Sequence, residues 1–494
     1  MTTLTTVMQL KSYINGEWVE SQKTIDIINP ANQEVIAVAP RMSKEQTEEA
    51  IQAAREAFDQ GEWAKTTTKE RSLILHEIAN KLEKRIHEFA VYETLDNGKL
   101  YAEAEADIED TVSCFRYYAG IILHPDGETY NVPDDVQAMV VKEPVGVAGL
   151  IVPWNFPLLM SAWKIAPALA AGNTIVYKPA EITPITAYKL FELFEEVGLP
   201  KGVANMVLGQ GSIIGQTISE SHDVDMVSFT GSTDIGRGIM RAAAGNLKKI
   251  SLELGGKSPN IVFADADLEV AVDYGLFGIF LGAGQVCSSG SRILVQDTIF
   301  DAYVERYVAR AEKIVVGPGM NKDTNMGAIV SEGQMNSILG YIKKGIAEGA
   351  TLKTGGYRLM DHDRDKGFFI APTVFTDVDQ SMTIVREEIF GPVVTIQKFS
   401  TEEEAVALAN DTDFGLAGGV FSNDGAKALR VIKQIRAGIT WVNDYHPTYV
   451  EAPWGGYKQS GIGRSLGKYS LEEFQEVKQI NIRLNVEPNG WFPQ

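Results

Sequence analysis

The stretch FGIFLGAGQVCSSGSRILV, residues 277–295, surrounds Cys287 with glycine, alanine and serine. A cysteine in a protein core normally has bulky apolar neighbours and behaves as a small hydrophobic residue. The small side chains here leave space for another molecule to reach the sulfur. This stretch alone fits two interpretations, a nucleophilic thiol and an inert thiol in a tight buried loop.

A cysteine nucleophile needs a base, because a free thiol with a pKa of about 8.5 is mostly protonated at neutral pH. The candidate base is Glu253, which stands between Leu252 and Leu254 at a predicted strand end. Partial burial there would raise the pKa of its carboxyl group into a useful range. The alternative is a glutamate on the outer face of the strand, paired with Lys257.

The same chemistry needs a hydrogen-bond donor for an oxygen that becomes negative when a thiolate adds to a carbonyl group. PWNFP, residues 153–157, holds Asn155 between two prolines. Its amide is the candidate donor, with the backbone N–H of Cys287 as a second one. Loss of one such donor typically costs about 2.7–4 kcal/mol of transition-state stabilisation. The alternative is that Asn155 supports a turn.

The elements that must position these residues follow from the hydrophobic pattern. From Ser43 to about Glu109, apolar residues recur at three- and four-residue spacing, which predicts helices. AMVVKEPVGVAGLIVPW then indicates two short strands broken by Glu143-Pro144. Strands and helices alternate up to a seam at residues 252–260, and again from there to about Gly438. Such alternation predicts parallel sheets with crossover helices, in two α/β domains that enclose a cleft.

Glycine-rich turns in this pattern indicate a dinucleotide site, because helix N-termini attract pyrophosphate. GQGSIIG, residues 209–215, has one residue more than the G-x-G-x-x-G pattern, and alone it fits a plain turn. FTGSTDIG, residues 229–236, is a second strand–turn–helix junction. Lys178 and Glu181 follow a strand end, where they either hold ribose hydroxyls or form a solvated pair. Together the three features favour a nucleotide.

The composition of the 494 residues excludes other classes of function. The net charge of −20 opposes binding to nucleic acid or to anionic membranes. We expect no membrane span and no signal peptide. The two cysteines, Cys114 and Cys287, fit a reducing compartment, so we expect a cytoplasmic protein. The six histidines form no close ligand pair, which argues against a metal site.

Six motifs together resemble the aldehyde dehydrogenase superfamily, in family order, from about Ile14 to Val477. They are VPWNFPLLMSAWKIAPALAAGNTIVYKPAE, FTGSTDIG, LELGGKSPNIVF, GQVCSSGSR, EEIFGPV and PWGGYKQSGIGR. The resemblance implies the α/β aldehyde dehydrogenase fold, with two parallel-sheet domains and a small β oligomerisation element. The implied segments are a Rossmann-like NAD-binding domain at 1–122 and 145–255, a catalytic domain at 256–475, and the oligomerisation element at 123–144 and 476–494. Relatives of this kind are homodimers or homotetramers.

The resemblance also implies an activity, the oxidation of an aldehyde. A thiohemiacetal would form on the cysteine, hydride would pass to NAD, and the resulting thioester would be hydrolysed. The implied catalytic residues are Cys287 as nucleophile, Glu253 as general base, Asn155 as oxyanion donor and Lys164 in proton transfer. The implied cofactor residues are Lys178 and Glu181 at the adenosine ribose, Gly211, Gly215 and Ser232 near the pyrophosphate, Glu388 and Phe390 at the nicotinamide, and Pro153, Trp154 and Phe229 beside them. Glu181 favours NAD because its charge would repel the 2′-phosphate of NADP, which stays open as a second cofactor.

The sequence is most similar to betaine aldehyde dehydrogenases and to general aldehyde dehydrogenases. In the betaine enzymes aromatic rings surround a trimethylammonium group, each contributing roughly 0.5–2 kcal/mol. The expected substrate residues are Phe156, Trp163, Leu281, Trp454 and Tyr449. Leu281 and Thr448 stand where aromatic residues are common, so the aromatic box is partial. Betaine aldehyde and an uncharged apolar aldehyde both stay open.

Three other classes compete with this interpretation. A cysteine hydrolase would need a histidine partner and no nucleotide. A CoA-acylating member of the superfamily would transfer the acyl group to coenzyme A. A non-enzymatic protein on the same fold would not need Cys287, Glu253 and Asn155 together.

One departure from the family pattern gives a first prediction. Many relatives carry glutamate after the arginine of the C-terminal G-x-G-R stretch, where it is thought to share a proton path with Lys164, but GIGRSLG has Ser465. Either the path then uses water or Glu253 exchanges protons directly with solvent, so we expect a pH-sensitive deacylation, with a burst of NADH before slow steady turnover. Ser465→Glu should abolish that burst in stopped-flow absorbance. Identical traces for the two proteins would contradict the prediction.

Overall fold

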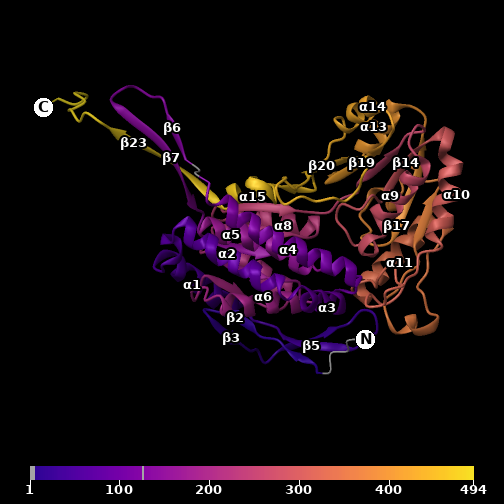
Figure 1. The fold of residues 1–494 in the computed structure, drawn as a ribbon, viewed down its shortest axis with the longest axis horizontal. Coiled ribbons are helices and arrows are strands. Elements are labelled where there is room, and N and C mark those ends of the chain that lie inside the picture. The colour runs from indigo at the N-terminus through magenta and orange to yellow at the C-terminus, as the bar shows by residue number, and fades with distance from the viewer. Residues whose placement is uncertain (1–5, 125–126, 494) are drawn as a thin grey trace.

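The computed structural model describes residues 6–124 and 127–493. Figure 1 shows two lobes, an indigo-to-magenta one and an orange one, with a narrow arm projecting from the first. Residues 1–5 of the predicted NAD-binding domain, and residues 125–126 and 494 of the predicted oligomerisation element, lie outside the described residues.

Four helices form the N-terminal part of the first lobe. They are α1 (Lys44–Asp59), α2 (Thr68–Glu83), α3 (Ile86–Asn97) and α4 (Tyr101–Ile121), with the short η1 (Trp63–Lys65) between the first two. Ser43 and Thr67 begin α1 and α2 with capping boxes, in which the side chains of residues three positions apart satisfy free backbone N–H groups. The helical region predicted to end near Glu109 continues to Ile121, because buried apolar residues keep their helical spacing through α4.

An eight-stranded sheet forms the centre of this lobe. Its order is β22-β12-β11-β8-β9-β10-β2-β3, and the five strands from β12 to β10 run parallel. The strands are β2 (Ser12–Ile14), β3 (Glu17–Val19), β8 (Val147–Ile151), β9 (Thr174–Lys178), β10 (Ala204–Met206), β11 (Met226–Thr230), β12 (Lys249–Glu253) and β22 (Gly461–Ile462). The crossover helices are α5 (Pro157–Ala171), α6 (Ile185–Glu196), α7 (Gly211–Glu220) and α8 (Thr233–Ala243). The parallel strands are almost fully buried, as expected where helices cover both faces.

The strand order reverses between β8 and β11, because β9 and β10 extend the sheet on one side and β11 and β12 on the other. In open α/β sheets, ligands bind outside the carboxyl ends of the strands at such a switch point. Lys178 and Glu253 are the last residues of β9 and β12, and the segments that follow β8 and β11 carry Asn155 and Ser232. The topology therefore gathers predicted catalytic and cofactor residues at one edge.

The second lobe is built on a seven-stranded sheet of order β15-β16-β17-β14-β13-β19-β20, parallel except for β15. The strands are β13 (Pro259–Val262), β14 (Arg292–Gln296), β15 (Thr351–Thr354), β16 (Thr373–Thr376), β17 (Val393–Phe399), β19 (Ala417–Phe421) and β20 (Ile439–Val442). The helices are α9 (Leu268–Phe280), η2 (Leu281–Gly284), η3 (Asp297–Ile299), α10 (Phe300–Ala311), α11 (Glu332–Ala347), η4 (His362–Lys366), α12 (Thr383–Arg386), α13 (Glu402–Asn410) and α14 (Gly425–Ile432). The two alternating regions predicted from the sequence are thus two sheets with crossover helices.

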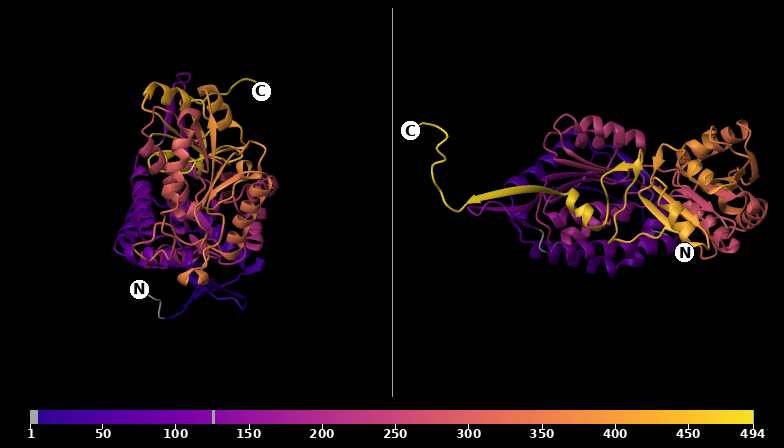
Figure 2. Two further views of the ribbon diagram at one scale, coloured as in Figure 1. Left: turned by 90° about the vertical axis from the view of Figure 1, so that its right-hand side faces the viewer. Right: turned by 90° about the horizontal axis from the view of Figure 1, so that it is seen from above.

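The arm is a three-stranded antiparallel sheet of β6 (Glu128–Tyr130), β7 (Val136–Pro144) and β23 (Gln475–Arg483), which joins distant parts of the chain (Figure 2). The strand break predicted at Glu143-Pro144 was wrong, because both residues pair with β23. The chain turns instead at Gly146, whose φ of 137° favours glycine. Proline is tolerated there because it ends the strand.

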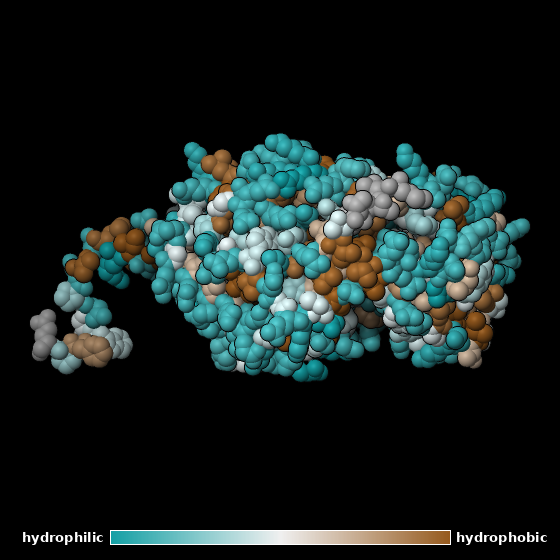
Figure 3. Space-filling view, turned by 90° about the horizontal axis from the view of Figure 1, so that it is seen from below, coloured by the Kyte–Doolittle hydropathy of each residue, from teal (hydrophilic) through white to brown (hydrophobic). Residues whose placement is uncertain are grey.

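Smaller elements complete the molecule. They are the sheet of β1 (Met8–Gln9), β4 (Thr24–Ile28) and β5 (Val35–Pro40), the pair β18 (Phe414–Gly415) and β21 (Tyr457–Lys458), and α15 (Gly467–Glu473). The face shown in Figure 3 is largely hydrophilic, but hydrophobic side chains follow the projecting arm. In the segment after β23, Val486 and Trp491 are 86% and 81% exposed. Among the described residues, no helix is long and apolar enough to cross a membrane.

Arg292, the last residue of the GQVCSSGSR motif, is buried and holds three backbone segments together. Its guanidinium group is 2% exposed and donates to the backbone carbonyls of Lys257, Leu408 and Ala409 at 2.8–2.9 Å. A planar group with several donors suits such a set of acceptors. Arg292 therefore ties the loop after Cys287 to the seam and to the end of α13.

Candidate active site

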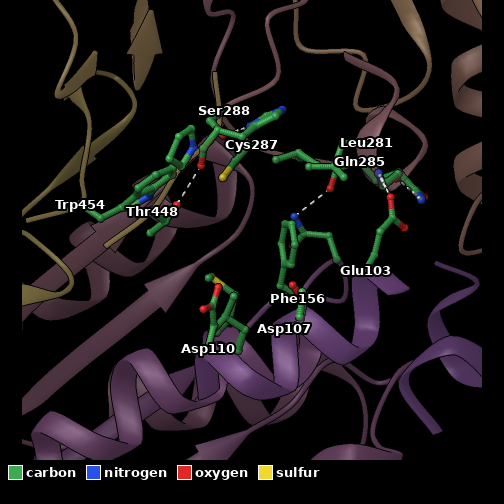
Figure 4. Close-up of a pocket in the computed structure, with 18 of the residues that line it drawn as sticks. Glu103, Asp107, Asp110, Phe156, Leu281, Gln285, Cys287, Ser288, Thr448 and Trp454 are labelled. Carbon is green, nitrogen blue, oxygen red and sulfur yellow. Dashed lines mark hydrogen bonds between the residues drawn. The ribbon is translucent and has the colours of Figure 1, made fainter. Parts of the chain in front are cut away.

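A cavity of about 540 Å³ contains the three residues proposed for catalysis, with Asn155, Glu253 and Cys287 all in its wall. Asn155 follows β8, Glu253 ends β12, and Cys287 lies between η2 and β14. Figure 4 shows the Cys287 sulfur directed into this space. The three groups thus share one cavity although 34 to 132 positions separate them along the chain.

The wall of the cavity also contains most of the expected substrate residues. Phe156, Trp163, Leu281, Thr448 and Trp454 line it. The rings of Trp163 and Trp454 meet edge to face with their centroids 5.6 Å apart. Tyr449, expected in the same set, is 63% exposed and is not among the lining residues, because its neighbour Thr448 faces the cavity.

The Cys287 thiol is held in its protonated form. Burial raises its pKa to about 12, and the negative charges of Glu388 and Glu253 add to that rise. The backbone N–H groups of Ser288 and Cys287 oppose it. The thiol must therefore lose its proton to a base, or gain a nearby positive charge, before it can act as a nucleophile.

Glu253 is 4% exposed, which excludes a position on the outer face of its strand. Burial raises the pKa of its carboxyl group, while Lys164 and then Ser465 oppose the rise. Lys164 Nζ donates to Ser228 Oγ at 3.0 Å, and burial lowers its pKa. Lys257, the alternative partner of Glu253, instead lies near Arg292 and Glu388. Glu253 is thus a buried carboxyl group suited to accept a proton.

Ser465 is placed beside Glu253 by its backbone. Its N–H donates to the Trp454 carbonyl and its carbonyl accepts from the Trp454 N–H, both at 2.7 Å. The side chain is 4% exposed. The residue that departs from the family pattern therefore lies against the predicted base and behind an aromatic wall of the cavity.

The Asn155 side chain has a fixed orientation. It is 6% exposed, and its Nδ2 donates to the backbone carbonyl of Gln285 at 2.8 Å. An amide nitrogen carries two hydrogens, so the second one is available to another acceptor. Since Gln285 is two residues from Cys287, this bond sets the amide relative to the sulfur.

The residues predicted at the adenosine ribose lie at the end of β9. Burial lowers the pKa of Lys178 to about 8, opposed by Glu181, and its Nζ donates to the Pro179 carbonyl at 2.9 Å. Glu181 accepts a hydrogen bond from Arg41 Nε at 2.7 Å. Sequence reasoning missed Arg41, because a pairing across 140 positions leaves no local signal.

Two helices begin beside these residues. Gly211 is the first residue of α7, where an added Cβ would lie 3.8 Å from Lys178 Cε, and Gly215 lies in the second turn. Ser232 precedes α8 without capping it through its side chain. Gly231 is required because a Cβ there would overlap the Phe229 ring. Two adjacent helix N-termini offer free N–H groups to an anion.

The predicted nicotinamide residues lie between the two sheets. Glu388 Oε1 accepts from Gly256 N–H at 3.0 Å, and burial raises the pKa of Glu388 to about 7. Phe390 meets Trp154 edge to face with the ring centroids 5.2 Å apart. Trp154 and Pro153 belong to the loop after β8 that carries Asn155. This loop therefore links the predicted cofactor region to the cavity.

An acidic face of α4 forms a further wall, which the sequence reasoning missed. Glu103, Asp107 and Asp110 all line the cavity (Figure 4). Asp107 accepts a hydrogen bond from the buried Lys99, whose Nζ also lies 4.4 Å from the centroid of the Phe156 ring. Spacings of four and three residues place the acids on one face of a helix, and that signal was present in the sequence.

His446 is a second residue that the sequence reasoning did not single out. It lines the cavity, and its ring nitrogens lie 3.3 Å from Ser288 Oγ and 3.2 Å from the Gly278 carbonyl. Burial lowers its pKa to about 4, so the ring is neutral. With both nitrogens engaged, His446 is not arranged as a base for Cys287. Among the described residues, no group of three or more possible ligands could hold a metal ion.

Comparison with known proteins identifies the family. Residues 18–480 match the model of the aldehyde dehydrogenase family. The chain belongs to this family. That result confirms the resemblance, the fold class and the enzyme class predicted from the motifs.

Individual relatives of this aldehyde dehydrogenase cover nearly its whole length. It is 50% identical over 483 residues to a betaine aldehyde dehydrogenase of Bacillus subtilis, covering 97% of this chain and 99% of the relative. It is 44% identical to aminoaldehyde dehydrogenase 2 of Zea mays, covering 97% and 96%. A crystal structure of Staphylococcus aureus betaine aldehyde dehydrogenase in complex with NAD⁺ is 50% identical, with a TM-score of 0.97 over 99% of this chain and 97% of that one.

The electrostatics of Cys287 give a prediction that needs no substrate. Glu388→Gln should lower the pKa of the thiol, because the negative charge of Glu388 is the largest cause of its rise after burial. Alkylation of Cys287 by iodoacetamide in the free protein should therefore become faster at mildly alkaline pH, where Glu388 is ionised. The matched control is Glu387→Gln, since Glu387 bonds outward to Tyr341. Equal rates for the two variants would contradict the assignment.

Proposed function

We propose that this aldehyde dehydrogenase oxidises a cationic aldehyde, of the betaine aldehyde or aminoaldehyde type, to a carboxylate with NAD as cofactor. The observation that carries the proposal is the common cavity of Cys287, Asn155 and Glu253, one wall of which is acidic and another aromatic. The roles of the individual residues below are part of the proposal.

The polar groups at the ends of β9 and β11 suit a dinucleotide. Two helix N-termini and the Lys178 ammonium suit a pyrophosphate and ribose, and Glu181 suits ribose hydroxyls. When bound, NAD supplies the acceptor for the hydride that leaves the substrate carbon. The charge of Glu181 favours NAD over NADP, while its partner Arg41 keeps NADP open as a weaker cofactor.

In the first half of the proposed reaction, the Cys287 thiol gives its proton to Glu253, which passes it on to solvent, and the thiolate adds to the aldehyde carbon, so that the carbonyl oxygen becomes negative. The second Asn155 amide hydrogen and the Cys287 N–H donate to that oxygen. Both donors are held in place before the substrate arrives, because Asn155 is already bonded to Gln285. Loss of hydride from the tetrahedral carbon leaves a thioester on the sulfur.

In the second half, Glu253 takes a proton from a water molecule that attacks the thioester. The C–S bond breaks, the Cys287 thiolate leaves, and the carboxylic acid that forms loses its own proton to solvent as the carboxylate. The buried carboxyl group is suited to this step because its raised pKa makes it a stronger base than an exposed glutamate. Its proton reaches solvent by way of water, since Ser465 offers a hydroxyl where many relatives offer a carboxylate.

The composition of the cavity supports a cationic substrate. Trp163 and Trp454 line the cavity, where a ring face attracts an ammonium group. Phe156 contributes less than expected, because the Lys99 ammonium already occupies one face of its ring. Asp110 stands at the open rim, where partial burial and the charges of Asp107 and Glu109 raise its pKa to about 6. The carboxylate is thus ionised at neutral pH and attracts a cation.

The relatives support the same substrate class by what their names say of them, betaine aldehyde in one case and aminoaldehydes in another. Both kinds of molecule carry a positive charge near an aldehyde. An uncharged apolar aldehyde is the second candidate, because Leu281 and Thr448 replace aromatic residues in the wall.

The proposal also covers the oligomeric state, the domain division and the cellular location of the protein. We propose that residues 123–144 and 476–494 join copies of the chain into a homodimer or homotetramer, since they form the projecting arm with its exposed apolar side chains. We also propose cofactor segments at 1–122 and 145–255 and a catalytic segment at 256–475, which the two sheets support except at β22, a strand of the first sheet. A cytoplasmic location stays a prediction from the sequence.

A panel of aldehydes tests the activity. We expect NADH formation that is fastest with betaine aldehyde or an aminoaldehyde, slower with hexanal, and unchanged by added coenzyme A. Cys287→Ala should lose at least about a thousandfold in kcat, because it removes the nucleophile. Full activity in that variant would contradict the nucleophile, acceleration by coenzyme A with acyl-CoA formation would identify an acylating enzyme, and preference for hexanal would contradict the cationic substrate.

Asp110 gives a prediction about substrate charge. Asp110→Asn should raise KM for the cationic aldehyde about two- to fivefold, the range of an exposed ion pair, and leave KM for hexanal unchanged. In the unmodified enzyme, KM for the cation should fall as the pH rises through about 6, when Asp110 ionises. Glu109→Gln, on the neighbouring exposed position, is the control. An equal change for both aldehydes would contradict a charge effect.

A further inference from the structure

Glu103 connects α4 to the turn that precedes Cys287 (Figure 4). Its Oε1 accepts a hydrogen bond from the Gly282 N–H, and its Oε2 accepts one from the Leu100 N–H, both at 2.9 Å. Leu100 begins α4 in the first lobe, whereas Gly282 belongs to the second. One carboxylate thus bridges the two lobes through backbone groups alone.

The turn that Glu103 holds has an unfavourable backbone. Gly282, Ala283 and Gly284 have φ values of 57°, 55° and 73°, all in the left-handed region. Alanine rarely adopts this conformation, because its Cβ approaches the following carbonyl oxygen. Such a segment persists only when surrounding contacts enforce it. The bond from Gly282 to Glu103 is one of those contacts.

The turn continues directly into the proposed oxyanion site. The Gln285 N–H and its Nε2 both donate to the Gly282 carbonyl, at 3.1 and 3.2 Å, and Gln285 Oε1 accepts from the Val330 N–H at 3.0 Å. The Gln285 carbonyl in turn accepts from Asn155 Nδ2. A shift of Gly282 therefore moves the acceptor that orients the Asn155 amide.

We propose that Glu103 is a positioning residue, which holds the left-handed turn and, through Gln285, sets the Asn155 amide against the substrate oxygen. The inference rests on the proposed role of Asn155. Glu103 itself takes no proton and makes no bond with the reacting carbon. A purely structural role, as a helix cap of α4, is the alternative that the experiment must separate.

The test is a double-mutant cycle of Glu103→Gln and Asn155→Ala, read as the single-turnover rate of NADH formation. A glutamine side chain has one carbonyl oxygen, so it satisfies only one of the two N–H groups and directs its own N–H groups at the other. In the unmodified background we expect Glu103→Gln to slow the rate between about tenfold and a hundredfold, by misplacing the amide. In the Asn155→Ala background the same change should cost less than about twofold, because the amide is already absent.

A second measurement reports on the turn without any reaction. Exchange of the amide hydrogens of residues 281–287, followed by mass spectrometry on the free protein, should become faster in Glu103→Gln. Glu105→Gln is the matched control, since Glu105 lies on the same helix and accepts its hydrogen bond from the Tyr101 hydroxyl at 2.7 Å, away from the turn. If Glu103→Gln does not fold, Glu103→Asp replaces it in the double-mutant cycle with Asn155→Ala. Aspartate keeps the negative charge, but its side chain is one methylene group shorter.

The outcomes separate the inference from the proposed function. Equal fold-losses in the two backgrounds, or unchanged exchange at residues 281–287, would overturn the positioning role while leaving aldehyde oxidation intact. A normal rate in Asn155→Ala alone would refute the proposed oxyanion donor. An unmodified protein that forms no NADH with any aldehyde would refute the proposed function itself.

Discussion

The burial of ionisable groups in one space between two sheets is the constraint on which the site depends. Removal from water raises the pKa of Cys287, Glu253 and Glu388 and lowers that of Lys164. Each group is thereby biased toward its neutral form. Because the pKa of the thiol still lies above that of the Glu253 carboxyl group, the thiolate forms only when its charge is stabilised as the proton leaves.

The polar groups in this space are oriented mainly by the backbone. Asn155 bonds to a carbonyl, Glu388 to the N–H of Gly256, and Glu103 to two N–H groups. Backbone partners suit this purpose because the sheets and helices hold them rigidly, so little reorganisation is needed when charge develops on a substrate. The strained turn before Cys287 fits the same principle, since strain is retained where surrounding contacts impose it.

The cavity combines an aromatic wall with an acidic helix face, and the two are not independent. Lys99 bonds to Asp107 and approaches the ring of Phe156, so a cation of the protein itself already uses part of both walls. Among the described residues, Asp110 has no such ion-pair partner, and it is the exposed acid of the cavity wall. Charge attraction would therefore act where a substrate enters, and aromatic contact deeper in the cavity.

The sequence by itself determined the fold class, the strand–helix order and the motif that carries the thiol, because small residues, periodicity and turn signals act over short stretches of chain. It also supplied Asn155 and Glu253 as candidates, through a proline-flanked loop and a strand end. It misplaced the break after β7 and included Tyr449 in the wall, since pairing with β23 and the direction of a side chain depend on distant segments. Only the tertiary structure decided the partners: Arg41 with Glu181, Gln285 with Asn155, Glu103 with Gly282. Those pairings and the pKa shifts arise from long-range packing, which sets distance and burial and leaves no local trace in the sequence.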